Sequence, residues 1–195
     1  MRCYEPRDAA LLKRAVDASL EHLRPWMPWA RDEPRPLDEK IGLLRSFRGQ
    51  FDLDQNYVYG VFTPDESQVV GGSGLHPRVG DGGLEIGYWI STAEVGKGYA
   101  TEVAAALTRV AFALPEVDRV HIHIDPDNVA SIRVPRKLGF VEEATLRRRL
   151  PPRPPGGQRR DQLTFTMLRE ELVASPCAAA RVRAFDAARR EVSIS

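Results

Sequence analysis

The chain has few cysteines, no excess of charge of either sign and no long apolar run. Only two cysteines, Cys3 and Cys177, occur in its 195 residues, and they lie near opposite ends. A disulfide between them is possible, but such sparse use of cysteine fits a reducing compartment better, and we expect a cytoplasmic protein. The N-terminus has no apolar signal core, and no stretch approaches the roughly 20 apolar residues that span a membrane. The sequence therefore argues against a disulfide-rich scaffold and an integral membrane protein.

Charge is nearly balanced over the whole chain. Lysine and arginine total 28 and aspartate and glutamate total 27, so the formal net charge is +1. This balance gives no overall attraction to nucleic acid or to an anionic membrane, and we expect neither as a partner. A Walker-type Gly-Lys-Ser/Thr turn is also missing, which argues against a P-loop nucleotide-binding protein. Positive charge is concentrated only locally, in one arginine-rich region: Arg147, Arg148, Arg149, Arg153, Arg159 and Arg160.

Helical and strand-like periods alternate along the chain, and its length suits one domain with a full core. Short turns between consecutive strands indicate antiparallel neighbours, whereas a helix after the third long strand indicates a parallel crossover. We therefore predict the α/β (α+β) class, with a mixed, mostly antiparallel, twisted sheet flanked by helices. The expected helices span residues 8–23, 37–51, 97–113 and 128–138. The expected strands span residues 2–5, 57–63, 69–76, 84–90, 119–125, 141–149 and 161–168.

Two segments lie outside this pattern. Residues 150–160 are rich in proline and glycine, which is incompatible with a regular helix or strand, and we expect a mobile loop there. Residues 176–195 fit either a frayed helix or a pair of strands through residues 182–184 and 192–194. Periodicity does not decide between these two interpretations.

A glycine-rich turn precedes the third expected helix. Gly96 and Gly98 allow the backbone to turn tightly and to bring its N–H groups close to an anion. The helix that begins after them adds unpaired N–H donors and the positive end of its dipole. These features predict a cradle for a diphosphate, although a glycine turn before a helix also occurs without any ligand.

The turn and the residues after it resemble two motifs of the GCN5-related N-acetyltransferase (GNAT) superfamily. Residues 93–98, Ala-Glu-Val-Gly-Lys-Gly, are similar to that family's Arg/Gln-x-x-Gly-x-Gly/Ala loop. The Asn-Val-Ala-Ser-Ile-Arg segment at 128–133, followed by Lys-Leu-Gly-Phe at 137–140, is similar to its second coenzyme A motif. The tryptophan- and proline-containing segment at 23–29 and Glu-Ile-Gly-Tyr-Trp at 85–89 resemble the RimJ/RimL branch, which includes ribosomal-protein N-terminal acetyltransferases.

The resemblance implies the acyl-CoA N-acyltransferase fold. It implies an N-acetyltransferase domain over residues 1–172 and a C-terminal extension over residues 173–195. The implied reaction moves an acetyl group from acetyl-CoA directly to a primary amine, which is a protein N-terminus or a small molecule, without a metal. No cluster of His, Cys and Asp has metal-ligand spacing. A homodimer is common in the resembled branch and is expected here only by that analogy.

By resemblance, coenzyme A binds mainly to the backbone of the turn and to the Asn-x-x-Ser element. Ala93 stands where the family usually has Arg or Gln, but binding should survive because backbone N–H groups hold the phosphates. Asn128 is either a helix cap or a partner of the pantetheine arm, and the two roles are compatible. The expected cofactor-binding residues are Ile90, Val95, Gly96, Lys97, Gly98, Tyr99, Ala100, Asn128, Ser131 and Arg133.

Two residues, Glu85 and Ser131, are expected to carry the chemistry. Many members of the superfamily protonate the leaving thiolate with a tyrosine, but Pro135 occupies that position here. Ser131 lies one helical turn earlier on the same face, where the RimJ/RimL branch has its serine; its alternative role is a bond to its own helix backbone. Glu85 is the expected base for the amine proton, or else a carboxylate paired with an arginine. Asp161 and His76 are secondary candidates for the base.

Contacts with the acceptor are expected from Trp26, Trp29 and His76. The two tryptophans belong to an aromatic, proline-braced corner that serves either packing or recognition. The arginine-rich region has three open interpretations: attraction of an acidic acceptor, contact with the 3′-phosphate of coenzyme A, or simple solvation. The histidines of the strand at 119–125 are expected on a helix-covered or solvent face, away from the chemistry.

A different class of function stays open on this sequence. Without the usual tyrosine, the chain also fits a non-catalytic acyl-CoA-binding module that senses the cofactor or serves as an interaction surface. Such a module would bind acetyl-CoA but would turn over no amine.

Overall fold

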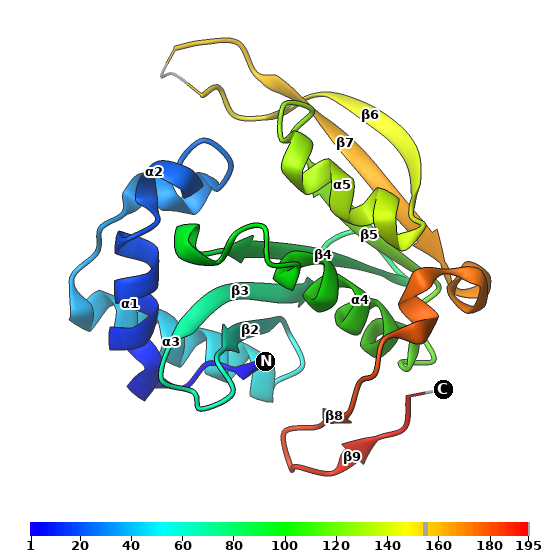
Figure 1. Ribbon diagram of the computed structural model, residues 1–195, viewed down its shortest axis with the longest axis horizontal. Coiled ribbons are helices and arrows are strands. Elements are labelled where there is room, and N and C mark those ends of the chain that lie inside the picture. Colours follow the sequence, from blue (N-terminus) through cyan, green and yellow to red (C-terminus); the bar gives the residue numbers. More distant parts are fainter. Residues whose placement is uncertain (154–155, 195) are drawn as a thin grey trace. The chain divides into compact units, whose positions relative to one another are not determined.

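The computed structural model describes residues 1–153 and 156–194. Its backbone falls into two compact units. The first unit contains Met1–Gly74 and Tyr88–Tyr99, and the second contains Leu75–Gly87 and Ala100–Ser195. Figure 1 labels the helices and strands that are named below.

Among the described residues, seven strands form a hydrogen-bonded sheet in the order β1-β2-β3-β4-β5-β7-β6. The β1–β2, β5–β7 and β6–β7 pairs are antiparallel, and the β4–β5 pair is parallel. The helix α4 (Tyr99–Phe112) connects β4 to β5, as expected because parallel neighbours require a crossover. The predicted class, a mixed and mostly antiparallel sheet with flanking helices, is confirmed.

The first unit contains the N-terminal helices and part of the sheet. Its elements are β1 (Arg2–Cys3), η1 (Pro6–Asp8), α1 (Ala9–Asp17), α2 (Leu20–Leu23), η2 (Pro28–Asp32), α3 (Leu37–Asp52), β2 (Tyr57–Phe62), most of β3 (Val69–His76), the end of β4 (Gly83–Ile90) and η3 (Thr92–Glu94).

The expected helix over residues 8–23 is wrong in one respect, because it breaks into α1 and α2. Ser19 lies at the break, and its hydroxyl accepts a hydrogen bond from the backbone N–H of Thr92 at 3.0 Å. Asp8 precedes α1, but its carboxylate does not cap that helix. It accepts instead from the guanidinium of Arg2 and from the backbone N–H of Glu5. Asp8 therefore fixes the turn η1 rather than the start of α1.

The core of the first unit forms between α1, α3 and the sheet. Leu12 and Val16 lie four residues apart on α1, so they share one face of that helix. Together with Tyr4, Leu44 and Val69 they form a buried cluster, in which Leu44 is fully buried. Burial of such side chains contributes roughly 1.5–3 kcal/mol each.

A buried ion pair fixes the segment between η2 and α3. The ammonium of Lys40, only 1% exposed, pairs with the carboxylate of Glu33, which is 3% exposed. The same carboxylate accepts from the backbone N–H of Arg35 at 2.8 Å, and the Glu33 carbonyl accepts from Arg24 at 2.8 Å. Every charge in this arrangement therefore has a partner, as buried charges require.

The second unit contains the parallel strand pair and the C-terminal half of the chain. Its elements are the end of β3, the start of β4, most of α4, β5 (Arg119–Ile124), α5 (Val129–Leu138), β6 (Val141–Leu150), β7 (Arg160–Leu168), η4 (Arg169–Ala174), η5 (Pro176–Ala179), β8 (Ala184–Phe185) and β9 (Glu191–Val192).

The strand β5 shows the alternation that its sequence predicts. Val120, Ile122 and Ile124 are at most 4% exposed, and His121 and His123 alternate with them. The helix α5 packs against β5 and β6 (Figure 1).

The sequence Lys-Leu-Gly-Phe at the end of α5 has a structural reason. Gly139 adopts the left-handed conformation, with φ of 85°, and ends the helix. Its N–H donates to the carbonyl of Arg136, and the N–H of Phe140 donates to that of Pro135. This is a Schellman motif, which favours glycine at the left-handed position. The helix continues through Pro135, although proline lacks the N–H that would pair with the Ser131 carbonyl.

The C-terminal segment is attached to the second unit by side-chain hydrogen bonds to free carbonyls. The guanidinium of Arg169 donates to the carbonyl of Phe112, the last residue of α4, and to that of Leu114, both at 2.6 Å. Cys177 is fully buried. Both cysteines are free thiols, so the chain has no disulfide between them.

Of the two interpretations for residues 176–195, the strand pair is the one that forms. Ala184 pairs with Val192 in the antiparallel β8–β9 hairpin. The expected irregular loop over residues 150–160 is found at residues 151–153 and 156–159, but its bounds are wrong at both ends, because Leu150 belongs to β6 and Arg160 to β7. Residues 154–155 of that loop lie outside the described part of the chain.

Candidate acetyl-transfer site

The glycine turn before α4 has the backbone that the sequence predicts. Gly96 and Gly98 have φ of +80° and +91°, a region that other residues rarely adopt. A Cβ atom built on either glycine would have no heavy atom of the protein within 4 Å. The outer side of this turn is therefore open to a ligand that approaches the backbone, which fits a diphosphate.

The ammonium of Lys97 forms an ion pair within the turn. Its ammonium pairs with the carboxylate of Glu94 at 2.9 Å, and the lysine side chain is 54% exposed. Val95 is also exposed, whereas Tyr99 and Ala100 are half-buried in the first turn of α4. Lys97 must leave Glu94 before it can add charge to a bound phosphate.

Asn128 occupies the N-cap position of α5, as the sequence predicts. Its side-chain oxygen accepts a hydrogen bond from the backbone N–H of Ser131 at 3.1 Å. The cap uses the acceptor oxygen and does not involve the two amide N–H donors. Asn128 and Ser131 thus lie together at the start of α5, with Arg133 exposed further along the helix.

Part of the arginine-rich region supports the segment before Asn128. Asp125 is only 8% exposed, and both Arg153 and Arg160 form ion pairs with it. Arg153 also pairs with Asp127 at 3.0 Å. These two arginines therefore hold the β6–β7 hairpin against the loop that leads into α5.

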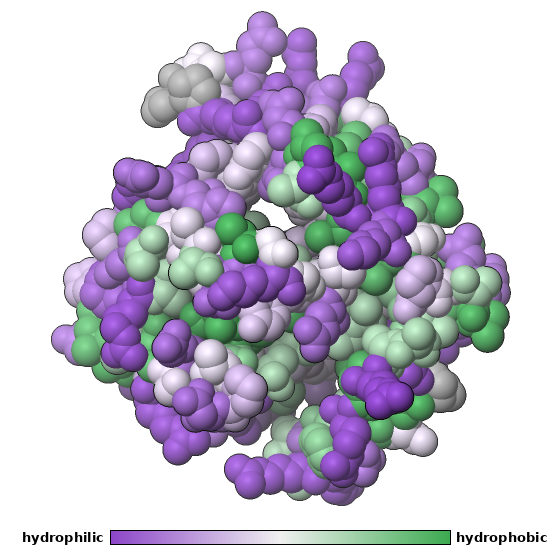
Figure 2. Space-filling model, in the orientation of Figure 1, coloured by the Kyte–Doolittle hydropathy of each residue, from purple (hydrophilic) through white to green (hydrophobic). Residues whose placement is uncertain are grey.

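The remaining arginines of this region lie nearer solvent. The guanidinium of Arg159 donates to the carbonyls of Arg148 and Arg149, both at 2.8 Å. Arg147, Arg148 and Arg149 are exposed on β6. The upper part of Figure 2, where the β6–β7 hairpin lies in Figure 1, is almost entirely hydrophilic.

Glu85 lies at the centre of a polar cluster in the second unit. Both of its oxygens accept hydrogen bonds from the guanidinium of Arg78, at 2.7 and 2.6 Å. Nδ1 of His123 lies 3.3 Å from the same carboxylate. Burial acts to raise the pKa of Glu85, but the hydrogen bonds from Arg78 and His123 outweigh it and lower the pKa to about 2.

This arrangement bears on the two interpretations of Glu85. Of these two interpretations, the structure shows the pairing of Glu85 with an arginine. A carboxyl group with so low a pKa stays ionised at neutral pH but is a weak proton acceptor. In this structure Glu85 is therefore an ionised carboxylate held by Arg78, whose own side chain is 60% exposed.

His76 is the third titratable group near Glu85. Burial, followed by the charge of Arg78, lowers its pKa to about 4, against the opposing effect of Glu85. Its imidazole lies against Gly87, where an added Cβ would be 3.5 Å from Nε2. His76 is thus a neutral, half-buried imidazole at neutral pH. Asp161 lies elsewhere in the second unit, and its carboxylate accepts from the backbone N–H of Arg148.

The tryptophans expected at the acceptor lie in the first unit. Trp29 is 37% exposed and contacts Trp89 edge to face, with ring centroids 5.9 Å apart. Gly72 makes room for Trp89, because a Cβ there would lie 2.5 Å from its Nε1. Trp26 is half-buried. Trp29 thus combines packing with an exposed aromatic surface.

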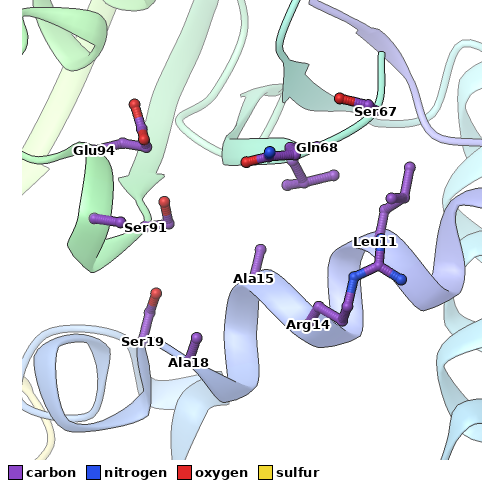
Figure 3. A pocket seen from close by; sticks show the side chains of 11 residues that line it. Leu11, Arg14, Ala15, Ala18, Ser19, Ser67, Gln68, Ser91 and Glu94 are labelled. Carbon is purple, nitrogen blue, oxygen red and sulfur yellow. The ribbon is translucent and has the colours of Figure 1, made fainter.

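The first unit also contains a cavity of about 440 Å³. Figure 3 shows that it lies between α1, the turn between β2 and β3, and the end of β4 with η3. Arg14 and Glu94 are its charged residues, and Ser19 and Ser91 lie on the same side as Glu94. Ile90, which precedes this segment, is buried.

Sequence reasoning missed two residues of the Glu85 cluster, Arg78 and His123. The sequence pattern could have indicated His123, because alternation along β5 places His123 on the same face as His121. In the parallel β4–β5 pair His121 is the register partner of Glu85. The histidines were expected on a helix-covered or solvent face, and the structure places His123 beside Glu85.

The low pKa of Glu85 predicts a pH-dependent contribution to stability. Because its pKa is lowered from 4.5 to about 2, the contribution is present above about pH 4.5 and is lost as the pH falls toward 2. The shift corresponds to about 3 kcal/mol. We expect the difference in unfolding free energy between wild type and Glu85→Gln to shrink by up to that amount between neutral pH and about pH 2. Urea unfolding at several pH values measures it, and a difference independent of pH would contradict the assignment.

Residues 1–141 match the family described as Acetyltransferase (GNAT) domain. The match covers more than half of the chain, so the chain belongs to the GNAT acetyltransferase family. The resemblance implied this family, and the identification of the family is confirmed. The glycine turn, the Asn-capped helix and the mixed sheet are the parts of the fold that agree with it.

Curated relatives and a solved structure give the same family and point to its RimJ/RimL branch. Bacillus subtilis YdaF, a candidate ribosomal N-acetyltransferase, is 29% identical over 173 residues, 88% of this chain and 91% of that protein. The ribosomal protein uS5-alanine N-acetyltransferase of Escherichia coli is 27% identical over 149 residues, 73% of this chain and 75% of that enzyme. The structure of Mycobacterium smegmatis RimJ in complex with CoA-disulfide has a TM-score of 0.77 and 25% identity, covering 91% of this chain and 85% of that one. The chain is thus an N-acetyltransferase similar to these proteins.

Two further observations concern the described residues only. None of their helices is both long and apolar enough to cross a bilayer. Within the same part of the chain, no group of three or more His, Cys, Asp or Glu side chains is arranged to hold a metal ion.

Proposed function

We propose that this protein transfers an acetyl group from acetyl-CoA to a primary amine by direct attack in a ternary complex. The observation that carries the proposal is the open turn at Gly96 and Gly98, whose positive φ angles present backbone N–H groups at the start of α4. Such a turn binds a diphosphate through the N–H groups and the helix dipole. The amide donors of Asn128, which its cap does not use, would bind the pantetheine arm.

The chemistry needs one proton removed and one supplied. The amine nitrogen attacks the thioester carbonyl carbon, the C–N bond forms, and the C–S bond then breaks to release the thiolate. Ser131, in the first turn of α5, would donate a hydrogen bond to the departing sulfur; a thiolate leaves readily, so a weak donor suffices. Glu85 would supply the negative charge that favours loss of the amine proton. Neither cysteine is placed as a nucleophile, because both are buried.

The relatives support one class of acceptor. One relative is named for the alanine of ribosomal protein uS5 and another as a candidate ribosomal N-acetyltransferase. We propose a protein N-terminus as the acceptor of this chain too, with Trp26 and Trp29 as contact residues. Small-molecule amines are the second class of acceptor to test, because enzymes that acetylate proteins and enzymes that acetylate small molecules share the same coenzyme A motifs. A cytoplasmic location and a homodimer stay predictions.

Release of coenzyme A thiol from acetyl-CoA, measured with a panel of N-terminal peptides, amino acids, polyamines and aminoglycosides, tests the proposal. Turnover on one class supports the enzyme and names its acceptor. Tight binding of acetyl-CoA without turnover on any amine would favour the non-catalytic sensor instead.

Cofactor binding by the turn is tested with Gly98→Ala. Alanine at a φ of +91° costs roughly 1–2 kcal/mol, so the turn relaxes out of its binding conformation. We expect acetyl-CoA to bind about tenfold more weakly in calorimetry. Gly80→Ala is the matched control, since Gly80 has φ of +84° in the turn between β3 and β4 and should cost stability without changing affinity. Equal affinity of Gly98→Ala and wild type would remove the turn from the cofactor site.

A further inference from the structure

The histidines beside Glu85 are not equivalent. Thr166 Oγ1 donates its only proton to Glu143, so it accepts from Nδ1 of His121 at 3.0 Å. Nε2 of His121 accepts from the Arg119 guanidinium at 3.1 Å. His121 is therefore held as the Nδ1–H tautomer with both nitrogens occupied. It cannot accept a proton at Nε2 without losing the bond from Arg119.

His123 has a different set of neighbours. Its Nδ1 faces the carboxylate of Glu85, which is an acceptor only, so Nδ1 carries the proton. Nε2 is then the unprotonated nitrogen of the neutral ring. The side chain is 17% exposed, so the ring is reachable from solvent. It stacks on His121 with ring centroids 6.0 Å apart, which fixes its plane.

A buried hydroxyl marks a polar position next to this ring. Thr164 is the register partner of His123 in the antiparallel β5–β7 pair, so both side chains lie on the same face of the sheet. Its hydroxyl is buried and, among the described residues, has no hydrogen-bond partner. Buried hydroxyls are normally satisfied by protein or by a bound polar group. An amine or a water held there would lie beside His123.

The cluster around Glu85 and His123 contains charged and titratable groups from several strands. Glu85 on β4 is the nearest charge and is negative, with its two oxygens also bound by Arg78. The other titratable groups of the cluster are His76 on β3, Arg119 and His121 on β5, and Glu143 on β6. A carboxylate that orients one imidazole nitrogen and stabilises the imidazolium is a recurring device in proton transfer.

We propose that Nε2 of His123 takes the proton from the attacking amine, and that Glu85 acts as the positioning residue that holds His123. This inference rests on the proposed acetyl transfer. As the C–N bond forms, the amine nitrogen gives one proton to Nε2, and the imidazolium returns it to solvent after the thiolate has left. The carboxylate of Glu85 stays ionised throughout.

Replacement of His123 tests the proposal by kinetics. We expect His123→Ala to lower kcat by about a hundredfold or more with acetyl-CoA affinity unchanged. Added imidazole should restore part of the lost rate, more strongly for more basic imidazoles, which a purely structural role would not show. His22→Gln, at an exposed histidine in the first unit, is the control and should match wild type. Activity of His123→Ala within threefold of wild type, or loss with intact cofactor binding and no rescue, would overturn the proposal.

Nitrogen NMR of the imidazole rings tests the geometry without any turnover. At alkaline pH we expect His123 and His121 both as Nδ1–H tautomers, the minor form of free histidine, and Glu85→Gln to change only the signals of His123 strongly. A neutral His123 protonated at Nε2 would overturn the proposal. If wild type acetylates no amine while the tautomers are as expected, the proposed function fails and the geometry stands.

Discussion

Glu85→Gln is expected to reduce kcat/KM for acetyl transfer by about a hundredfold to a thousandfold, with little change in acetyl-CoA affinity. Glutamine keeps the shape of the side chain but removes the negative charge that Arg78 and His123 share. Without that charge the imidazole is no longer stabilised when it becomes cationic. Steady-state kinetics with a reactive amine, together with calorimetric titration of acetyl-CoA, measures both quantities.

Glu142→Gln is the matched control for this loss of a carboxylate. Glu142 forms an exposed ion pair with Arg136 at 2.7 Å. Exposed pairs contribute little to stability, roughly 0–1 kcal/mol, and Glu142 has no place in the proposed chemistry. Activity of Glu85→Gln within threefold of wild type would show that the reaction does not need the charge at this position.

Lys40→Met is expected to lower the free energy of unfolding by roughly 3–5 kcal/mol. The substitution keeps an apolar chain of similar length but leaves the carboxylate of Glu33 buried without its cation. An unpaired buried charge is far more costly than the loss of an exposed salt bridge. Urea unfolding followed by circular dichroism measures the change.

Two comparisons make this prediction specific. Lys13→Met breaks the partly exposed pair of Lys13 and Asp17 at 2.6 Å on α1, and should cost at most about 0.5 kcal/mol. The double variant Lys40→Met with Glu33→Gln should recover much of the lost stability, because no unpaired charge remains. If Lys40→Met proved as mild as Lys13→Met, the burial of this ion pair would not hold in solution.

Local sequence patterns predicted most of the fold. The alternation in β5, the helical stripe of α3 and the glycines before α4 each depend on near neighbours in the chain, so their signals are readable without a structure. The cap at Asn128 and the end of α5 at Gly139 are also local features. The backbone of the turn at Gly96 and Gly98 was predictable for the same reason.

The contacts around Glu85 are not local. Glu85 meets Arg78 across the turn between β3 and β4, and meets His123 only because β4 and β5 are parallel neighbours. Alternation placed the two histidines on one face of β5, but the register that brings this face to Glu85 depends on strand order. The pairing of Lys40 with Glu33 likewise depends on how the chain folds before α3.

The proposed reaction of this GNAT protein moves an acetyl group from acetyl-CoA to an amine. The most direct test incubates the full chain with isotope-labelled acetyl-CoA and the amine panel, and follows coenzyme A thiol release and acetylated product by mass spectrometry. We expect one acetyl group on the nitrogen of one class of amine, in an amount that matches the thiol released. We expect no acetylated cysteine in the protein. Tight acetyl-CoA binding with no labelled product from any amine would contradict it.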